Sequence, residues 1–373
     1  MLRKIIVSIA TVVLLSFWLG NQQSQAQINL DLGGYMQNWY IANQSNEIFD
    51  TSVENTRTLE TQGFRVRRAR LVARGNLNER FSATTWIEFA GSTPSVLDFH
   101  FDAHFRPWFN IRIGQFRMAG QSYDTGILGS ASLPFYERPG ITSHVAGVMG
   151  YSAFRDIGVM AYGRHGRLWY GVHAGNGAGR FNHAGSVITE RKSGGGLYGA
   201  RVDLEVLDGF TLGGHVSTNQ QRDVVQAGTG PFDIDRTSWS LRLVTNNFGI
   251  DGLFSQFEYV GLTGKDDSRG VSLGTDREYN VHGFYTELGY RFTREWHLLG
   301  RYDEMVEKPG QVGLANEFDR FASNNYTLGI SRFIYDGNSE LARIYLNYSF
   351  GKSGPTDLDN SILVAVFQLR FIP

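Results

Sequence analysis

Residues 98–105, Asp98-Phe99-His100-Phe101-Asp102-Ala103-His104-Phe105, alternate strictly between polar and apolar side chains. Successive side chains of a β-strand point to opposite faces, so the apolar residues share one face and the polar residues share the other. An α-helix would scatter the same residues around its circumference. The segment is therefore predicted to be a strand with one apolar and one hydrated face.

The same alternation recurs on both sides of this segment. About sixteen such segments begin near residues 28, 62, 81, 97, 110, 155, 167, 196, 210, 236, 249, 279, 296, 325, 339 and 361. Short turns alternate with long connections rich in Gly, Asp, Asn and Ser, and the long ones include residues 43–60 and 117–154. This asymmetry is typical of transmembrane barrels. The predicted fold class is all-β, a 16-stranded antiparallel transmembrane β-barrel with long outer loops.

Composition sets limits on function. The 373 residues carry 35 Lys and Arg against 36 Asp and Glu, for a formal net charge of −1. This balance lacks the concentrated positive charge with which proteins bind nucleic acid. The chain has no cysteine, which excludes disulfides, thiol nucleophiles and cysteine-ligated metals. We expect neither a nucleic-acid partner nor a cofactor.

The first 26 residues have the features of a cleavable signal peptide. Arg3 and Lys4 give a basic start, residues 5–19 are apolar, and Ser24-Gln25-Ala26 supplies small residues for cleavage. The apolar run is shorter than the roughly 20 residues of a membrane-spanning helix, which argues against an anchor. Residues 1–26 are thus predicted to direct export. Residues 27–373 would form a barrel in lipid, in the outer membrane of a Gram-negative-type bacterium.

Aromatic residues also indicate a membrane environment. Barrels carry girdles of aromatic side chains where their strands meet the membrane interfaces. The residues at or near predicted strand ends are Trp39, Tyr40, Trp86, Trp108, Trp169, Tyr170, Trp239, Trp296 and Tyr348. A soluble β-sandwich or propeller, the alternative fold, would carry polar residues at these positions.

Five short motifs follow one another between residues 61 and 163. They are Phe64-Arg65-Val66-Arg67-Arg68-Ala69-Arg70-Leu71-Val72-Ala73-Arg74-Gly75, Phe101-Asp102-Ala103, Ile113-Gly114-Gln115-Phe116-Arg117, Tyr136-Glu137-Arg138-Pro139 and Arg155-Asp156-Ile157-Gly158-Val159. In this order they resemble the phosphate-selective porins of the O and P type. The resemblance implies a homotrimeric outer-membrane barrel whose third outer loop folds inward to narrow the pore. It also implies an arginine ladder and a lysine-rich constriction that pass phosphate.

Strand parity gives candidate pore-lining residues. If Ala69, Leu71 and Ala73 face lipid, the residues between them face the lumen. Applied along the chain, the rule selects Arg68, Arg70, Arg74, Asp98, Asp102, Arg112, Arg201, Arg242, Arg301 and Arg343, and further acids at Glu88, Asp203, Glu205, Glu287 and Asp303. Guanidinium groups match oxyanions, and rings of arginine select anions in channels. Pairing with the acids would instead leave a polarised, non-selective channel.

Lysine is scarce in the predicted barrel. Only Lys192, Lys265, Lys308 and Lys352 follow residue 26, and none lies in the third connection. The lysine-rich constriction implied by the resemblance is therefore absent. Arg117 and Arg138 are the candidate constriction-loop cations. The predicted function is passive diffusion of small hydrophilic solutes, general or mildly anion-preferring rather than strictly selective for phosphate.

Other residue groups give weaker signals. His100 and His104 share a face, but side chains two apart on a strand are roughly 6.6 Å apart, which disfavours a shared metal ion. Residues 175–179 are glycine-rich but lack the strand and helix that frame a nucleotide site, so a loop is expected. No enzymatic activity is predicted. The alternatives are a barrel hydrolase, with His173 or His215 beside a serine, and a loop-borne adhesin or structural barrel.

Overall fold

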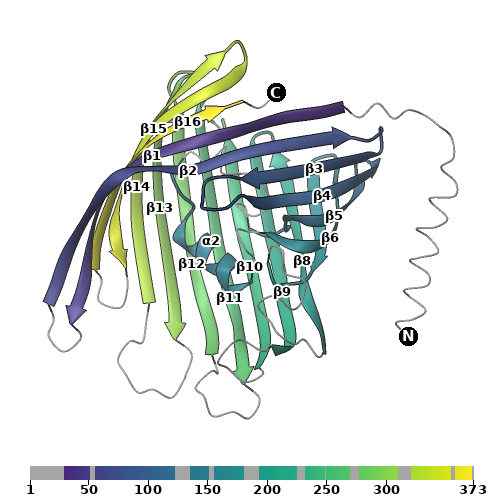
Figure 1. Ribbon diagram of the computed structural model, residues 1–373, viewed down its shortest axis with the longest axis horizontal. Helices are drawn as coiled ribbons and strands as arrows, with labels where there is room; N and C mark the ends of the chain where they lie inside the picture. Colours follow the sequence, from purple (N-terminus) through teal and green to yellow (C-terminus); the bar gives the residue numbers. More distant parts are fainter. Residues whose placement is uncertain are drawn as a thin grey trace.

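The computed structural model describes residues 29–50, 55–121, 135–150, 155–179, 193–224, 232–247, 249–268, 277–309, 321–353 and 358–371. The elements within these ranges are β1 (Asn29–Asp50), β2 (Asn55–Asn76), β3 (Phe81–Glu88), β4 (Ser95–Arg106), β5 (Phe109–Arg117), α2 (Gly140–Val148), β6 (Arg155–His165), β7 (Leu168–Gly175), β8 (Ser193–Leu207), β9 (Phe210–Val224), β10 (Phe232–Asn246), β11 (Leu253–Ser268), β12 (Arg277–Arg291), β13 (Trp296–Pro309), β14 (Phe321–Asp336), β15 (Ser339–Ser353) and β16 (Leu358–Arg370). Each strand pairs antiparallel with the next, and β1 pairs with β16, so the sheet is a closed barrel (Figure 1). The predicted fold class is confirmed.

Tight turns gather at one end of the barrel and long connections at the other (Figure 1). Gly209 ends the turn between β8 and β9 with a φ of 74°, and Gly337 begins the turn between β14 and β15 with a φ of 56°. This left-handed conformation suits two-residue hairpin turns and favours glycine.

The predicted long loop at residues 43–60 is wrong, because β1 and β2 stay paired as far as Asp50 and Asn55.

Burial alternates along the strands. On β15, Ile344, Leu346 and Tyr348 are exposed on the outer wall, whereas Arg343 and Asn347 are buried inside the barrel. Water would favour the reverse arrangement, so the apolar outer wall matches a lipid environment. No helix among the described residues is long and apolar enough to cross a membrane.

Three tryptophans predicted to join the outer girdle lie on the inner face of the barrel instead. Trp86 is opposite Val72 and Asp98, two buried residues that face inward. Trp39 is only 1% exposed and packs among buried residues of the inner wall. It sits in the middle of β1, because that strand begins at Asn29 and is much longer than expected.

Trp169 packs against the apolar cluster inside the barrel. Val172 of the same strand is exposed on the outer wall, and Trp169, three residues earlier, therefore points to the opposite, inner face.

The described part of the third long connection, residues 118–121 and 135–150, enters the barrel. Its helix α2 contacts β11, β12 and β13 from inside (Figure 1). The buried residues Ile141 and Val145 of α2 pack against inward-facing apolar side chains. The wall residues that β11, β12 and β13 contribute to this cluster are Val260, Leu262, Val281, Tyr285 and Met305. Burial of apolar surface therefore holds the loop against one side of the lumen, and the inward-folded third loop is confirmed.

Candidate pore lumen and constriction

The residues predicted by parity lie on the inner face of the barrel. Those that are buried are Arg68, Asp98, Asp102, Arg201, Arg242, Arg301 and Arg343. Arg70 and Arg112 are partly exposed, and Arg74 is exposed on the same face of β2, near the turn end. This is the face that parity assigned to them, and their role in lining the pore stays a prediction.

A β-bulge on β2 adds two arginines that parity missed. Gln37 pairs with Arg68 and Asn38 pairs with Val66, so Arg67 is the extra residue of the bulge. A bulge shifts the alternation by one residue. Val66 therefore faces outward, and Arg65 and Arg67 join Arg68 on the inner side. The adjacent arginines of Arg67-Arg68 were the one sequence signal of this shift.

These arginines surround Trp39. The guanidinium carbons of Arg65, Arg67 and Arg68 lie 4.7, 5.3 and 5.8 Å from the centroid of its ring. Such cation–π contacts hold positive charges together that would otherwise separate. Glu137, from the third loop, accepts hydrogen bonds from Arg67 Nε at 2.9 Å and from Arg68 Nη2 at 3.4 Å.

Arg138 adds a fourth positive charge to this group. Burial, together with the nearby charge of Arg68, lowers the pKa of Arg138 to about 10. Burial alone would raise the pKa of Glu137, but Arg68 and Arg67 outweigh burial and hold it below its usual range. Both groups are thus charged at neutral pH. We call Arg65, Arg67, Arg68, Arg138 and Glu137 the arginine cluster.

Most other inward arginines have a carboxylate partner. The pairs and their shortest nitrogen–oxygen distances are Arg70–Glu88 at 2.6 Å, Arg112–Asp102 at 2.8 Å, Arg155–Asp98 at 2.7 Å, Arg201–Asp203 at 3.0 Å, Arg242–Asp203 at 2.5 Å, Arg301–Asp303 at 3.4 Å and Arg343–Glu340 at 3.2 Å. These pairs give a polarised wall with little net charge. Among the described residues, the arginine cluster is where positive charge exceeds negative charge most clearly.

The described part of the third loop crosses the lumen. At one end, Tyr136 meets Trp39 edge to face at 5.7 Å, and its backbone N–H donates to Asn347 Oδ1 at 2.8 Å. At the other end, Asn219 Nδ2 donates to the carbonyl of Met149 at 2.8 Å. Between them, the backbone N–H of Gly140 donates to Asp303 at 3.1 Å. The loop therefore touches opposite walls and narrows the space between them.

A cavity of about 240 Å³ remains between the loop and the wall. Its lining includes Asn43, Arg138, Arg301, Asn325, Thr327 and Ser349. These side chains offer guanidinium, amide and hydroxyl groups to a hydrated solute. Arg117, the second predicted loop cation, is instead the last residue of β5, where it interacts electrostatically with Arg155, Asp98 and Arg138.

The remaining sequence candidates have local partners. His100 Nδ1 lies 3.0 Å from Asp102, whereas His104 contacts Ser82 and Asn110. Within the described ranges, no group of three or more His, Asp or Glu residues is arranged to hold a metal ion.

The glycine-rich segment at 175–179 surrounds a carboxylate of the chain itself. The backbone N–H groups of Gly177 and Gly179 donate to Asp156 at 2.5 and 3.1 Å. The segment is a loop, as predicted, and its donors are already used.

One histidine does lie beside serines. His215 Nδ1 is 2.7 Å from Ser240 Oγ, which donates to Glu258 at 2.6 Å, and His215 Nε2 is 3.3 Å from Ser238. All four side chains are buried in the wall of the barrel. A nucleophilic serine must reach its substrate, so this network is better explained as structural hydrogen bonding. His173 is also buried, on β7.

Comparison with known proteins agrees with this geometry. The family model described as phosphate-selective porin O and P matches residues 42–202. This range contains β2 with its bulge, the third loop and its motif Tyr136-Glu137-Arg138-Pro139. No curated protein matches the chain.

Solved structures of similar fold include outer-membrane channels. The channel DcaP of Acinetobacter baumannii is 12% identical, with a TM-score of 0.61 and coverage of 94% of this chain and 99% of that chain. The anion-selective porin from Comamonas acidovorans is 12% identical, with a TM-score of 0.58 and coverage of 92% and 100%. Salmonella typhi OmpF, in complex with daunomycin, is 11% identical, with a TM-score of 0.63 and coverage of 92% and 97%.

At such low identities these structures establish the fold alone. The family match over residues 42–202 adds the arginine-rich strand and the third loop to that fold. The chain is an outer-membrane β-barrel of the porin type, and over residues 42–202 it is similar to the phosphate-selective porin O and P family.

Proposed function

We propose that this porin passes small hydrophilic solutes by passive diffusion and prefers anions, phosphate among them. The observation that carries the proposal is the arginine cluster, in which four guanidinium groups surround Glu137 where the third loop meets β2. An ion in a narrow passage passes within a Debye length of such charges, about 8 Å at physiological salt. The cluster would therefore raise the local concentration of anions.

The preference is expected to be mild. No lysine lies between Arg117 and Arg155, so this chain lacks the lysine-rich constriction that its resemblance to the family implies. The ion pairs along the rest of the wall offset most of the other arginines. A single cluster favours anions as a class. It does not supply the series of binding groups that would discriminate phosphate from other anions.

Reversal potentials test this proposal. The purified protein is placed in a planar bilayer under a KCl gradient, and we expect a reversal potential of the sign that marks chloride as the more permeant ion. The preference should weaken as the salt concentration rises, because screening shortens the reach of the cluster. A cation-preferring channel at low salt would contradict the proposal.

Export and assembly complete the proposal. We infer that residues 1–26, which lie outside the described residues, are removed during export and that three copies assemble. OmpT of Vibrio cholerae, solved in a trimer form, supports a trimer by its similar fold, with a TM-score of 0.58, 11% identity and coverage of 92% of this chain and 99% of that chain.

Intact mass and N-terminal sequencing check the export step. Protein extracted from outer membranes should begin at Gln27. A mature protein that still begins at Met1 would contradict cleavage. Substituting Ala26→Arg should block processing and leave the precursor, because the cleavage site requires a small residue there.

A further inference from the structure

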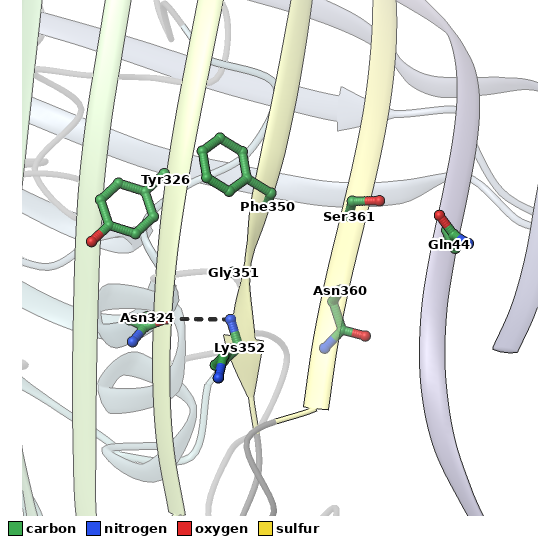
Figure 2. A pocket seen from close by; sticks show the side chains of 8 residues that line it. All are labelled: Gln44, Asn324, Tyr326, Phe350, Gly351, Lys352, Asn360 and Ser361. Atoms are coloured by element: carbon green, nitrogen blue, oxygen red, sulfur yellow. Dashed lines mark hydrogen bonds between the residues drawn. The ribbon is translucent and has the colours of Figure 1, made fainter. Parts of the chain in front are cut away.

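A hollow of about 610 Å³ opens on the outer wall at the loop end of the barrel. It crosses β14, β15, β16 and β1 (Figure 2). Its lining residues are Gln44, Asn324, Tyr326, Phe350, Gly351, Lys352, Asn360 and Ser361. Tyr326 and Phe350 are 47% and 39% exposed and share the outward parity of Leu328 and Tyr348. The hollow therefore faces the membrane side and lies outside the pore.

The hollow forms where a row of aromatic rings ends. Tyr302 and Tyr326 lie 4.8 Å apart, and Tyr326 stacks on Phe350 at 5.4 Å. In the register, Phe350 is opposite Ser361, and Ser361 is opposite Gln44. The row thus passes from large rings to a short hydroxyl side chain, and the missing ring volume leaves a concave surface.

The chemistry of the lining does not suit an acyl chain. Figure 2 shows side chains with amide, hydroxyl and ammonium groups grouped beside the two rings. Hydrocarbon cannot satisfy such groups. A second hollow on the outer wall, about 560 Å³ across β6 to β9, is lined by residues such as Val159, Ala161, Val172 and Val216. Lipid tails are sufficient to fill this apolar hollow. The polar lining of the hollow across β14, β15, β16 and β1 therefore indicates a polar occupant there.

The position of the hollow indicates what such an occupant is. Long loops mark the outer side of an outer-membrane barrel, so the hollow lies at the level of outer-leaflet headgroups. Rings that stack against a ligand, together with amide and hydroxyl groups, suit a sugar. Lys352 supplies a positive charge, and Asp359 lies opposite Lys352 in the strand register. Charge alone therefore does not define the ligand.

We propose that this hollow binds the phosphorylated sugar headgroup of an outer-leaflet glycolipid. Tyr326 and Phe350 pack against the sugar, Gln44, Asn324 and Ser361 hydrogen-bond to its hydroxyl groups, and Lys352 pairs with its phosphate. The site is on the outer wall, so its occupancy is independent of ion selectivity in the lumen.

Lipid binding by the intact protein tests the site. Lipid A, a phosphorylated and acylated glucosamine disaccharide, is titrated against the detergent-solubilised porin, and bound lipid is counted by native mass spectrometry. Ser361→Phe extends the row of rings into the hollow, and Lys352→Gln removes the cation. Each substitution should weaken lipid A binding roughly tenfold. For Lys352→Gln this is about the loss of one charge-assisted hydrogen bond, and for Ser361→Phe it is the loss of a similar amount of contact with the sugar. Dephosphorylated lipid A should bind the wild type roughly tenfold more weakly as well.

Thr286→Phe is the matched control, because Thr286 is exposed on the outer wall of β12, two strands away from Tyr326 of the lining and separated from it by Tyr302. It adds the same ring and should leave binding unchanged. Retained heat-modifiable migration establishes that each variant is folded. The proposal fails if Ser361→Phe binds lipid A like the wild type, if Thr286→Phe weakens binding equally, or if the phosphate makes no difference. Dissociation of the oligomer by Ser361→Phe would also overturn it and mark the hollow as a contact between copies.

Discussion

Replacing residues 118–154 by Asn-Gly is expected to raise single-channel conductance severalfold. The described part of the loop touches Trp39 and Asn347 on one wall and Asn219 on another, and so lies across the lumen between them. Arg117 and Arg155 are direct partners in the β5–β6 register, so the ends are close enough for a two-residue turn. Asn-Gly suits the turn that such a hairpin needs.

The barrel should survive this replacement at lower stability. The variant loses the contacts of Ile141, Val145 and Met149, which are fully buried. Each such side chain contributes about 1.5–3 kcal/mol when buried. All sixteen strands keep their hydrogen-bonded neighbours, so heat-modifiable migration should persist with a lower midpoint. Conductance is measured in planar bilayers under the same salt conditions for both proteins.

A second loop replacement separates constriction from a general effect of shortening. Residues 225–231, which connect β9 to β10, are replaced by the same Asn-Gly turn. This variant should conduct like the wild type if the third loop sets the narrowest point. Equal increases in both variants, or no increase in the first, would mean that the third loop does not limit the current.

The barrel itself was predictable from sequence because the environment acts on every strand alike. Lipid on one side and water on the other impose the alternation seen at Phe99, His100, Phe101 and Asp102. The same rule placed the starts of strands at residues 81, 155, 210, 296 and 339, as the structure has them. The turns were predictable too, because tight hairpin turns need a positive φ, which glycine adopts without strain.

The constriction was less predictable because its features depend on long-range contacts. The bulge at Arg67 depends on how β1 pairs with β2. A shift of one residue in that pairing leaves the composition of both strands unchanged, so composition does not reveal it. Val260 and Leu262 face the lumen although they are apolar, and only the docking of α2 explains them. Glu137 lay in a motif that was noted, but its role follows from its contact with Arg67, 70 residues away.

The triple substitution Arg65→Gln, Arg67→Gln and Arg138→Gln is expected to abolish anion preference. It leaves Arg68 beside Glu137 and so removes the local excess of positive charge. A unit charge about 8 Å from an ion contributes about 0.5 kcal/mol in water. Without screening, three such charges raise the local concentration of anions roughly tenfold relative to that of neutral solutes, and they lower the local concentration of cations by a similar factor. Screening at 0.1 M salt reduces this effect, so the anion-to-cation permeability ratio should fall severalfold, to about one, as measured by the reversal potential.

A control with the same loss of charge tests position. Arg74, Arg164 and Arg167 are exposed near the turn end of the barrel, away from the third loop. Their replacement by glutamine should change the reversal potential far less, because charges beyond about 10 Å are largely screened at 0.1 M salt. At 1 M salt, where the Debye length is about 3 Å, the difference between the two triple variants should shrink. If both triples shift the reversal potential equally at low salt, net charge rather than the arginine cluster governs permeation. If the cluster variant keeps the selectivity of the wild type, ions do not pass beside Trp39, and the path must lie on the other side of the third loop.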